Sequence, residues 1–166
     1  PWRPEQGKVV RMFCDISYPD GRPFERDTRS ILKQAVADAA ARGCQFAFGA
    51  EMEFYLFRVD ESGEATKIPY DRAGYMDIAP DDKGETIRRE ICLMLEQVGI
   101  RPESSHHESG PGQNEIDFRY SDPLTAADNA VTFHTVVRTV AAQNGLCASF
   151  SPKPLPDWDG NGMHLN

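Results

Sequence analysis

Two glutamates placed two residues apart are the first candidates for chemistry in this sequence. Glu51 and Glu53 lie in an aromatic-rich run, Phe46–Phe57, whose composition predicts a long strand. Side chains two positions apart on a strand point to the same face, so the two carboxylates would be presented together. Such a pair can bind a cation. A strand whose polar face meets solvent is nevertheless the more common reason for carboxylates in this arrangement.

Two further glutamates and a histidine shift the balance toward a metal site. Glu108 and Glu115 flank the turn Ser109–Gly112, whose Gly-Pro-Gly sequence predicts a β-hairpin that brings them close across adjacent strands. The alternative is a capped turn with solvated ends. Several carboxylates on one sheet face repel one another unless cations separate them, and oxygen-rich sites suit Mg²⁺ or Mn²⁺. His164 can add a nitrogen ligand, although a histidine taken alone is more often structural.

These residues need strands and helices that hold them together, and the sequence indicates both. Strands are predicted at Val9–Cys14, Phe46–Phe57, Glu103–His107, Gln113–Tyr120, Cys147–Phe150 and within Gly162–Asn166. Helices are predicted at Thr28–Arg42, with Asp27 as its cap, at Asp82–Val98 and at Pro123–Asn144. Residues 58–80 lack periodicity and are expected to run over the surface. This order predicts an α+β fold, a largely antiparallel sheet with helices packed on one side.

The apolar faces of the first two helices follow from their periodicity. The residues expected to form these faces are Ile31, Leu32, Ala35 and Val36 in the first helix and Ile87, Ile91, Leu93, Met94 and Val98 in the second. Gly43 and Gly99 are expected to end these helices.

The overall composition restricts the class of protein. The chain of 166 residues is long enough for one domain with a core. Its 18 Lys and Arg residues against 26 Asp and Glu give a net charge of −8, so we expect neither a nucleic-acid nor a membrane partner. It has no long apolar run or signal-peptide pattern. The four separated cysteines are typical of reduced, buried thiols in a cytoplasmic protein.

Three segments, in order, resemble glutamine synthetases. Phe48–Phe57 is similar to the strand that opens the active site of that family, and His106–Ile116 to its second metal-binding segment. Lys153–Leu155 followed by Gly160–His164 resembles the third. The start of the chain, with Pro-Trp at residues 1–2 and the stretch 14–21, also matches the beginning of the family's catalytic domain. The resemblance therefore covers essentially the whole chain.

The resemblance implies two divalent metal sites that bind Mg²⁺ or Mn²⁺. Glu53, Glu108 and Glu115 match the carboxylates of the metal nearer the acceptor glutamate. Glu51 and His164 match two ligands of the metal that bridges the ATP phosphates, whose third protein ligand would follow the end of this chain.

The same resemblance implies substrates and an activity. Gly160 and Asp159 would lie at the amino-acid substrate, and Tyr120 and Asn166 near the nucleotide. The implied enzyme is an ATP-dependent carboxylate–amine ligase, in which ATP phosphorylates the side-chain carboxylate of glutamate and ammonia or an amine then displaces phosphate. Family members form rings with active sites between subunits, so a homo-oligomer is expected.

The resemblance also implies a partial domain. Residues 1–166 would form the first part of the catalytic domain, without the family's N-terminal β-grasp domain and the C-terminal half of the catalytic domain. The non-Met start at Pro1 and a final strand without a turn signal lead to the same expectation. This chain alone is expected to bind metal weakly and to be inactive.

Two residues depart from the family pattern. Asp159 stands where many members carry asparagine, and Asn166 where many carry a second histidine near the phosphates. An added negative charge beside a glutamate carboxylate would weaken glutamate binding or favour an amine-bearing substrate. A γ-glutamyl–amine ligase and a non-catalytic assembly or regulatory protein are therefore alternatives to a glutamine-forming enzyme. A third is an unrelated metal-binding α+β domain, which three ordered segments disfavour.

Overall fold

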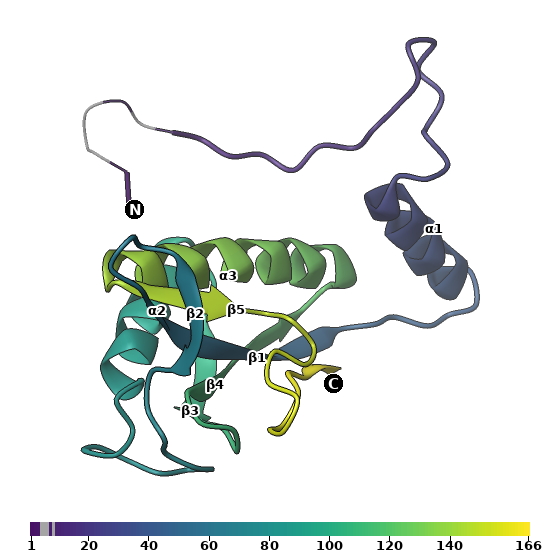
Figure 1. Cartoon of the computed structure of the whole chain (residues 1–166). Coiled ribbons are helices and arrows are strands. Elements are labelled where there is room, and N and C mark those ends of the chain that lie inside the picture. The colour runs from purple at the N-terminus through teal and green to yellow at the C-terminus, as the bar shows by residue number, and fades with distance from the viewer. Residues whose placement is uncertain (4–6, 8) are drawn as a thin grey trace.

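A central antiparallel sheet with two helices on one face forms the body of the protein. The computed structural model describes residues 1–3, 7 and 9–166. The helices are α1 (Thr28–Ala40), α2 (Glu85–Gln97) and α3 (Pro123–Gln143). The strands are β1 (Phe48–Val59), β2 (Ala65–Pro69), β3 (Pro102–His107), β4 (Gln113–Ser121), β5 (Leu146–Ser149) and β6 (Met163–Leu165). In Figure 1, α2 and α3 cover the sheet and α1 lies to one side of them; the N-terminal segment contacts α3, because the Arg11 guanidinium donates to the hydroxyl of Thr132.

Strand β1 lies at the centre of the sheet. The strand order is β2-β1-β4-β3, and β5 and β6 also pair with β1, in every case antiparallel. Glu51 of β1 is paired with Asp117 of β4 and with His164 of β6, so these two strands lie on opposite sides of β1. The predicted α+β class with a largely antiparallel sheet and helices on one side is therefore confirmed.

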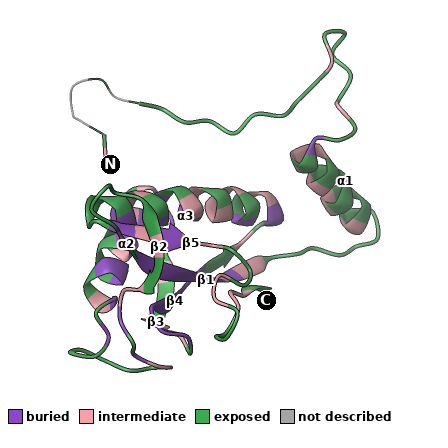
Figure 2. Cartoon of the chain, in the orientation of Figure 1, coloured by how far each residue is buried: buried purple, intermediate pink, exposed green. Residues whose placement is uncertain are grey.

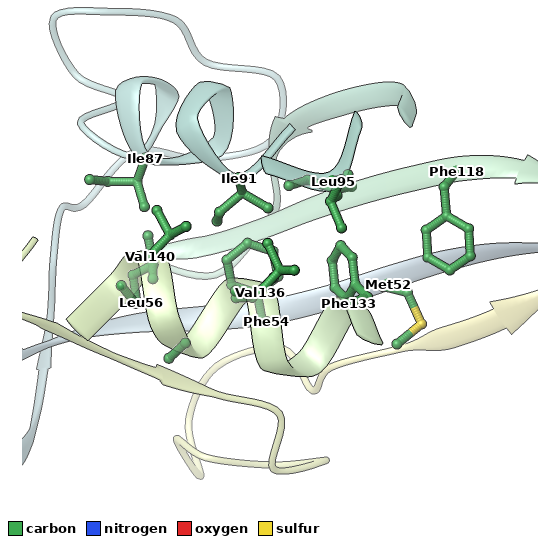
Figure 3. Close-up of a cluster of buried hydrophobic side chains, with 14 of the residues drawn as sticks. Met52, Phe54, Leu56, Ile87, Ile91, Leu95, Phe118, Phe133, Val136 and Val140 are labelled. Carbon is green, nitrogen blue, oxygen red and sulfur yellow. The ribbon is translucent and has the colours of Figure 1, made fainter. Parts of the chain in front are cut away.

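The alternation of side chains along β1 separates the core from the candidate site. Ala50, Met52, Phe54 and Leu56 are buried in the core with residues of α2 and α3. Figure 3 shows Ile91 and Leu95 of α2 meeting Phe133 and Val136 of α3 over this face of the sheet, among other core residues. Each such buried side chain contributes about 1.5–3 kcal/mol to stability. The residues between them, including both glutamates, must then point to the opposite face.

The predicted helix boundaries lie within three residues of those observed: α1 ends at Ala40 and not at Arg42, and α2 begins at Glu85 and not at Asp82. The Asp27 side chain accepts hydrogen bonds from the backbone N–H groups of Arg29 and Ser30, as an N-terminal cap does. Gly43 and Gly99 follow α1 and α2 with φ of 77° and 87°, conformations that glycine adopts without strain. The third helix, α3, begins at Pro123, behind the capping side chain of Asp122.

Three expectations about the first 100 residues are wrong. Val9–Cys14 forms no strand, because no other described segment pairs with it; Val9 is 66% and Val10 79% exposed. Helix α1 buries none of its residues, so its apolar stripe is not part of this core (Figure 2). In α2 the inward face includes Leu95, which is fully buried, instead of Leu93, which is 55% exposed.

Two smaller corrections concern the segment 58–80 and the cysteines. The strand β2 lies within that segment and pairs with the end of β1, so the segment is not wholly irregular. All four cysteines are free, but Cys14 and Cys44 are exposed and Cys92 and Cys147 only half-buried. Among the described residues, no helix combines the length and the apolar character needed to cross a lipid bilayer.

Candidate metal and substrate site

The pairing of β1 with its two neighbours collects acidic side chains on the face away from the helices. Glu53 is directly opposite Glu115 of β4, and Glu51 is opposite Asp117. Directly opposite residues in an antiparallel pair have Cβ atoms about 4.5–5.5 Å apart and share a face. The register therefore places four carboxylates on one patch of the sheet, as the spacing of Glu51 and Glu53 predicts.

Three of the five predicted ligands lie within reach of one ion. Glu51, Glu115 and His164 each present a ligand atom within 4.8 Å of the others. The imidazole Nδ1 of His164 is 3.2 Å from Oε2 of Glu51, and the side-chain amide of Asn166 donates to the other oxygen of Glu51 at 2.5 Å. The last strand of the chain thus brings a nitrogen ligand to the carboxylates of β1 and β4.

The hairpin between β3 and β4 supplies a second group of donors. His106, Glu115 and Asp117 also present ligand atoms within 4.8 Å of one another. The ring nitrogens of His106 are 3.8 Å from a carboxylate oxygen of Glu108 and 3.7 Å from one of Glu115. Glu108 therefore joins the group through His106.

His106 and Asp117 belong to the patch, although neither is among the site residues predicted from the sequence. Asp117 lies two positions after Glu115 on the same strand, and alternation alone would have placed it on the same face. His106 required knowledge of the register, because its position opposite Glu115 depends on the hairpin turn.

A buried glutamine connects Glu53 to the loop before β6. The side-chain amide of Gln113, which is fully buried, donates to Oε2 of Glu53 at 2.7 Å and to the carbonyl of Gly160 at 3.0 Å. A Cβ atom at Gly162 would lie 2.7 Å from Oε1 of Glu53 and 2.5 Å from Nε2 of His164. A side chain at position 162 would therefore require Glu53 and His164 to move from these positions.

The predicted substrate loop is held by two further side chains. The Tyr55 hydroxyl donates to the carbonyl of Asp159 at 2.6 Å. Burial, together with the charges of Asp159, Glu53 and Glu108, raises the pKa of Tyr55 to about 12, so this hydroxyl keeps its proton. The side chain of Asn161 donates to the carbonyls of Ser149 and Ser151 at 3.1 and 2.9 Å. The loop is therefore fixed against the sheet at several points.

The two residues predicted near the nucleotide lie in different places. Asn166 contacts Glu51 directly. Tyr120 is 62% exposed and lies near the end of β4, where its Cα and Cβ are close to Gly49. Five residues of strand separate it from Glu115, or roughly 16 Å along β4.

The electrostatics of the patch fit a divalent cation. Burial, then the hydrogen bond and charge of Asp117 and those of Glu108, raise the pKa of Glu115 to about 9. Burial and the charge of Glu51 also raise the pKa of Asp117, and its buried Oδ1 has no hydrogen-bond partner among the described residues. Clustered carboxylate oxygens with one imidazole are donors suited to Mg²⁺ or Mn²⁺. A cation would remove the repulsion that disfavours ionisation here.

Comparison with known proteins decides the family. The model of the glutamine synthetase catalytic domain matches residues 25–166. The chain belongs to the glutamine synthetase family. A glutamine synthetase of Clostridium saccharobutylicum is 54% identical over 166 residues, which are all of this chain and 38% of that protein. The glutamine synthetase of Staphylococcus aureus strain MW2 is 50% identical over 167 aligned positions, and the chain covers 37% of it. The chain thus spans less than two fifths of these glutamine synthetases.

Solved structures of the family have the same fold. Plasmodium falciparum glutamine synthetase, determined by cryo-electron microscopy, aligns with a TM-score of 0.80 and 27% identity over 92% of this chain and 36% of its own. A complex of GmaS with ADP aligns with a TM-score of 0.79 and 33% identity over 91% of this chain and 35% of its own. The glutamine synthetase fold therefore extends over nearly all of the chain.

Proposed function

We propose that this chain supplies the acidic metal-binding half of an ATP-dependent carboxylate–amine ligase of the glutamine synthetase type. The observation that carries the proposal is the meeting of Glu51, Glu115 and His164, from three strands, within reach of one ion. The family relationship to proteins named glutamine synthetase and the solved GmaS complex with ADP support a nucleotide-dependent ligase.

The proposed reaction has two transfers. A side-chain carboxylate oxygen of glutamate attacks the γ-phosphorus of ATP, the bond to the bridging oxygen breaks, and ADP leaves. The nitrogen of ammonia or an amine then attacks the carbonyl carbon of the resulting γ-glutamyl phosphate, the bond from that carbon to the phosphate oxygen breaks, and phosphate and a proton leave. Phosphoryl transfer of this kind depends on charge neutralisation and positioning more than on covalent help from the protein.

Five side chains would hold the two divalent ions. Glu51 and His164 would hold the ion at the nucleotide phosphates, and Glu53, Glu108 and Glu115 the ion nearer the acceptor carboxylate. Bound divalent ions supply the positive charge that lets two anionic substrates occupy a chain of net charge −8.

The chain's own residues position the substrate loop. Gln113 holds the Gly160 carbonyl beside Glu53, and Tyr55 holds the Asp159 carbonyl. These contacts keep the loop backbone, which we propose to contact the amino-acid substrate, at a fixed distance from the carboxylates. Tyr120 and Asn166 would lie toward the nucleotide.

A second candidate is a γ-glutamyl–amine ligase, and Asp159 favours it. A carboxylate at this position adds negative charge where the amino-acid substrate would bind, which favours an acceptor that carries a cationic nitrogen. A non-catalytic assembly or regulatory role is the third candidate. By family relationship we also propose a cytoplasmic homo-oligomer.

Phosphate release by the full-length protein distinguishes these candidates. The assay compares ammonia with small primary amines and diamines, in the presence of ATP, glutamate and Mg²⁺ or Mn²⁺. A glutamine-forming enzyme releases phosphate fastest with ammonia, whereas a γ-glutamyl–amine ligase prefers an amine. Absence of glutamate-dependent phosphate release with every acceptor would contradict both and favour the non-catalytic role. The 166-residue chain alone is expected to show none.

A further inference from the structure

A buried network of polar side chains lies directly behind the metal-ligand hairpin. Its members are nearly inaccessible to solvent and connect the loop before α2, α2 itself, β3 and β4: Asp71, Asp82, Arg88, His107 and Asn114. Burying so many charged and polar groups is costly unless all are hydrogen-bonded. The network therefore serves a purpose that an apolar core would not.

The Asp71 carboxylate accepts four hydrogen bonds, two on each oxygen. Its Oδ1 accepts from Nε2 of His107 at 2.9 Å and from the backbone N–H of Gly112 at 3.0 Å. Its Oδ2 accepts from the backbone N–H groups of Lys83 and Gly84 at 3.1 and 3.3 Å. One carboxylate thus ties the loop before α2 to β3 and to the turn that leads into β4.

Both contacts on the hairpin flank predicted metal ligands. Nδ1 of His107 lies 2.6 Å from the carbonyl oxygen of Glu108, which can only accept, so Nδ1 carries a proton and Nε2 faces Asp71. Gly112 has φ of +70° and no space for a side chain, because a Cβ would lie 2.9 Å from the Leu56 carbonyl. Asp71 therefore fixes the backbone at Glu108 and the turn that leads to Glu115.

Arg88 holds the other side of the same hairpin. Its guanidinium forms a two-point ion pair with Asp82 at 2.6 and 3.1 Å and donates to Oδ1 of Asn114 at 2.7 Å. The Asn114 amide donates to the Gly112 carbonyl at 3.0 Å. Asn114, the residue before Glu115, is therefore fixed as well. In the turn, the Gly112 N–H is bound by Asp71 and the Gly112 carbonyl by Asn114.

A second cation site is not the purpose of this network. Asp71, Asp82 and His107 present ligand atoms within 4.8 Å of one another. Asp71 already accepts four hydrogen bonds, Asp82 is paired with the Arg88 guanidinium through both oxygens, and His107 faces acceptors with both ring nitrogens. These contacts indicate that the network positions the β3–β4 hairpin and does not bind a further ion.

We propose that Asp71 is a positioning residue that sets the separation of Glu108 and Glu115 and thereby the affinity of the site for divalent cations. This inference rests on the proposed function, because it assigns a purpose to ligands that the function requires. Groups that orient metal ligands from behind typically change metal affinity by about 10–100-fold when they are removed.

The test compares Asp71→Ala and Asp71→Asn with Asp60→Ala in the full-length protein. Asp60 is a matched control, because it also accepts backbone N–H groups, those of Ser62 and Glu64, but in an exposed turn between β1 and β2. Mn²⁺ affinity is measured by calorimetry at a temperature where circular dichroism shows each variant folded. Amide hydrogen exchange of residues 108–115 is followed by NMR.

Asp71→Ala is expected to weaken Mn²⁺ binding by about 10–100-fold and to speed exchange of the Gly112 amide. Asp71→Asn, which keeps one acceptor oxygen, is expected to fall between that variant and the wild type, and Asp60→Ala to bind Mn²⁺ as the wild type does. A folded Asp71→Ala chain with wild-type affinity would overturn the inference. If the wild type itself binds no Mn²⁺, the proposed function fails, and unchanged exchange over 108–115 in Asp71→Ala would separately show that Asp71 does not hold the hairpin.

Discussion

Glu115 combines burial with two neighbouring acids, and this combination makes it the residue most sensitive to protonation in the patch. Burial, Asp117 and Glu108 raise its pKa from 4.5 to about 9. The folded state therefore holds this proton more tightly than the unfolded state. Its contribution to stability is complete below about pH 4.5 and is lost as the pH rises through about 9.

The metal-free chain should therefore unfold at progressively lower temperature as the pH rises over that range. Glu115→Gln removes the ionisation, so this variant should lose most of the dependence and should melt higher than the wild type at alkaline pH. Thermal unfolding followed by circular dichroism, with chelator present, measures both effects. Saturating Mn²⁺ should raise the melting temperature of the wild type, and this increase should be largest at high pH. The increase should be smaller for Glu115→Gln. Parallel pH profiles for the two chains would contradict the assignment.

Substitution of Gly162 tests whether metal affinity depends on the close approach of the last loop to Glu53 and His164. Replacing Gly162 by alanine would place a methyl group within 2.7 Å of Glu53 and 2.5 Å of His164, and both would have to move. Gly162→Ala should weaken Mn²⁺ binding by at least about tenfold. Gly49→Ala is the control, because its Cβ would meet only ordinary contacts at 3.7 Å or more. Equal affinities of the two variants in a calorimetric titration would show that the approach is unimportant.

At the scale of elements, helix α2 shows that the face it buries differs from the face predicted from its hydrophobic periodicity. Leu93 and Leu95 are two residues apart on the same helix, one 55% exposed and the other fully buried. Leu95→Ala should lower the free energy of unfolding by about 2–5 kcal/mol, and Leu93→Ala by less than about 0.5 kcal/mol. Urea unfolding of the two variants measures the difference. A larger loss for Leu93→Ala would mean that the helix packs through the face predicted from the sequence.

The sequence predicts the elements next to the site better than those far from it. Strong local signals define β1, the β3–β4 hairpin and α3: an aromatic run, a Gly-Pro-Gly turn, and a long helix that begins at Pro123 and ends at Gly145. Alternation then places Glu51 and Glu53 on one face, and the turn places Glu108 near Glu115. These contacts follow from local geometry and so can be predicted.

What the sequence could not give depends on contacts between distant segments. Val9–Cys14 has the composition of a strand, but a strand needs a partner, and none of the described segments pairs with it. His106 enters the site only through its register opposite Glu115. The Asp71 network joins residues 71 and 112 through a carboxylate whose neighbours in sequence carry no periodic signal. In each case long-range packing decides the outcome.

At the scale of the whole molecule, the negative net charge and the acidic patch both disfavour the binding of anionic substrates. A chain of charge −8 places four carboxylates on one face of its sheet, next to a loop proposed to bind an anionic amino acid. Bound cations or bound protons reconcile these features, since like charges at such separations destabilise one another. The stability of the apo chain and its affinity for divalent ions should therefore be linked, and residues that hold the patch together should affect both.

A calorimetric titration with Mn²⁺ that compares the full-length wild type with His164→Ala and His134→Ala determines whether the acidic patch binds a cation through His164. His134 is the matched histidine, because it stacks on Phe150 at 3.9 Å and is not in a described group of metal-ligand donors. We expect saturable binding by the wild type and by His134→Ala, and affinity at least about tenfold weaker in His164→Ala. Absence of saturable binding, or equal affinity of all three chains, would contradict this expectation.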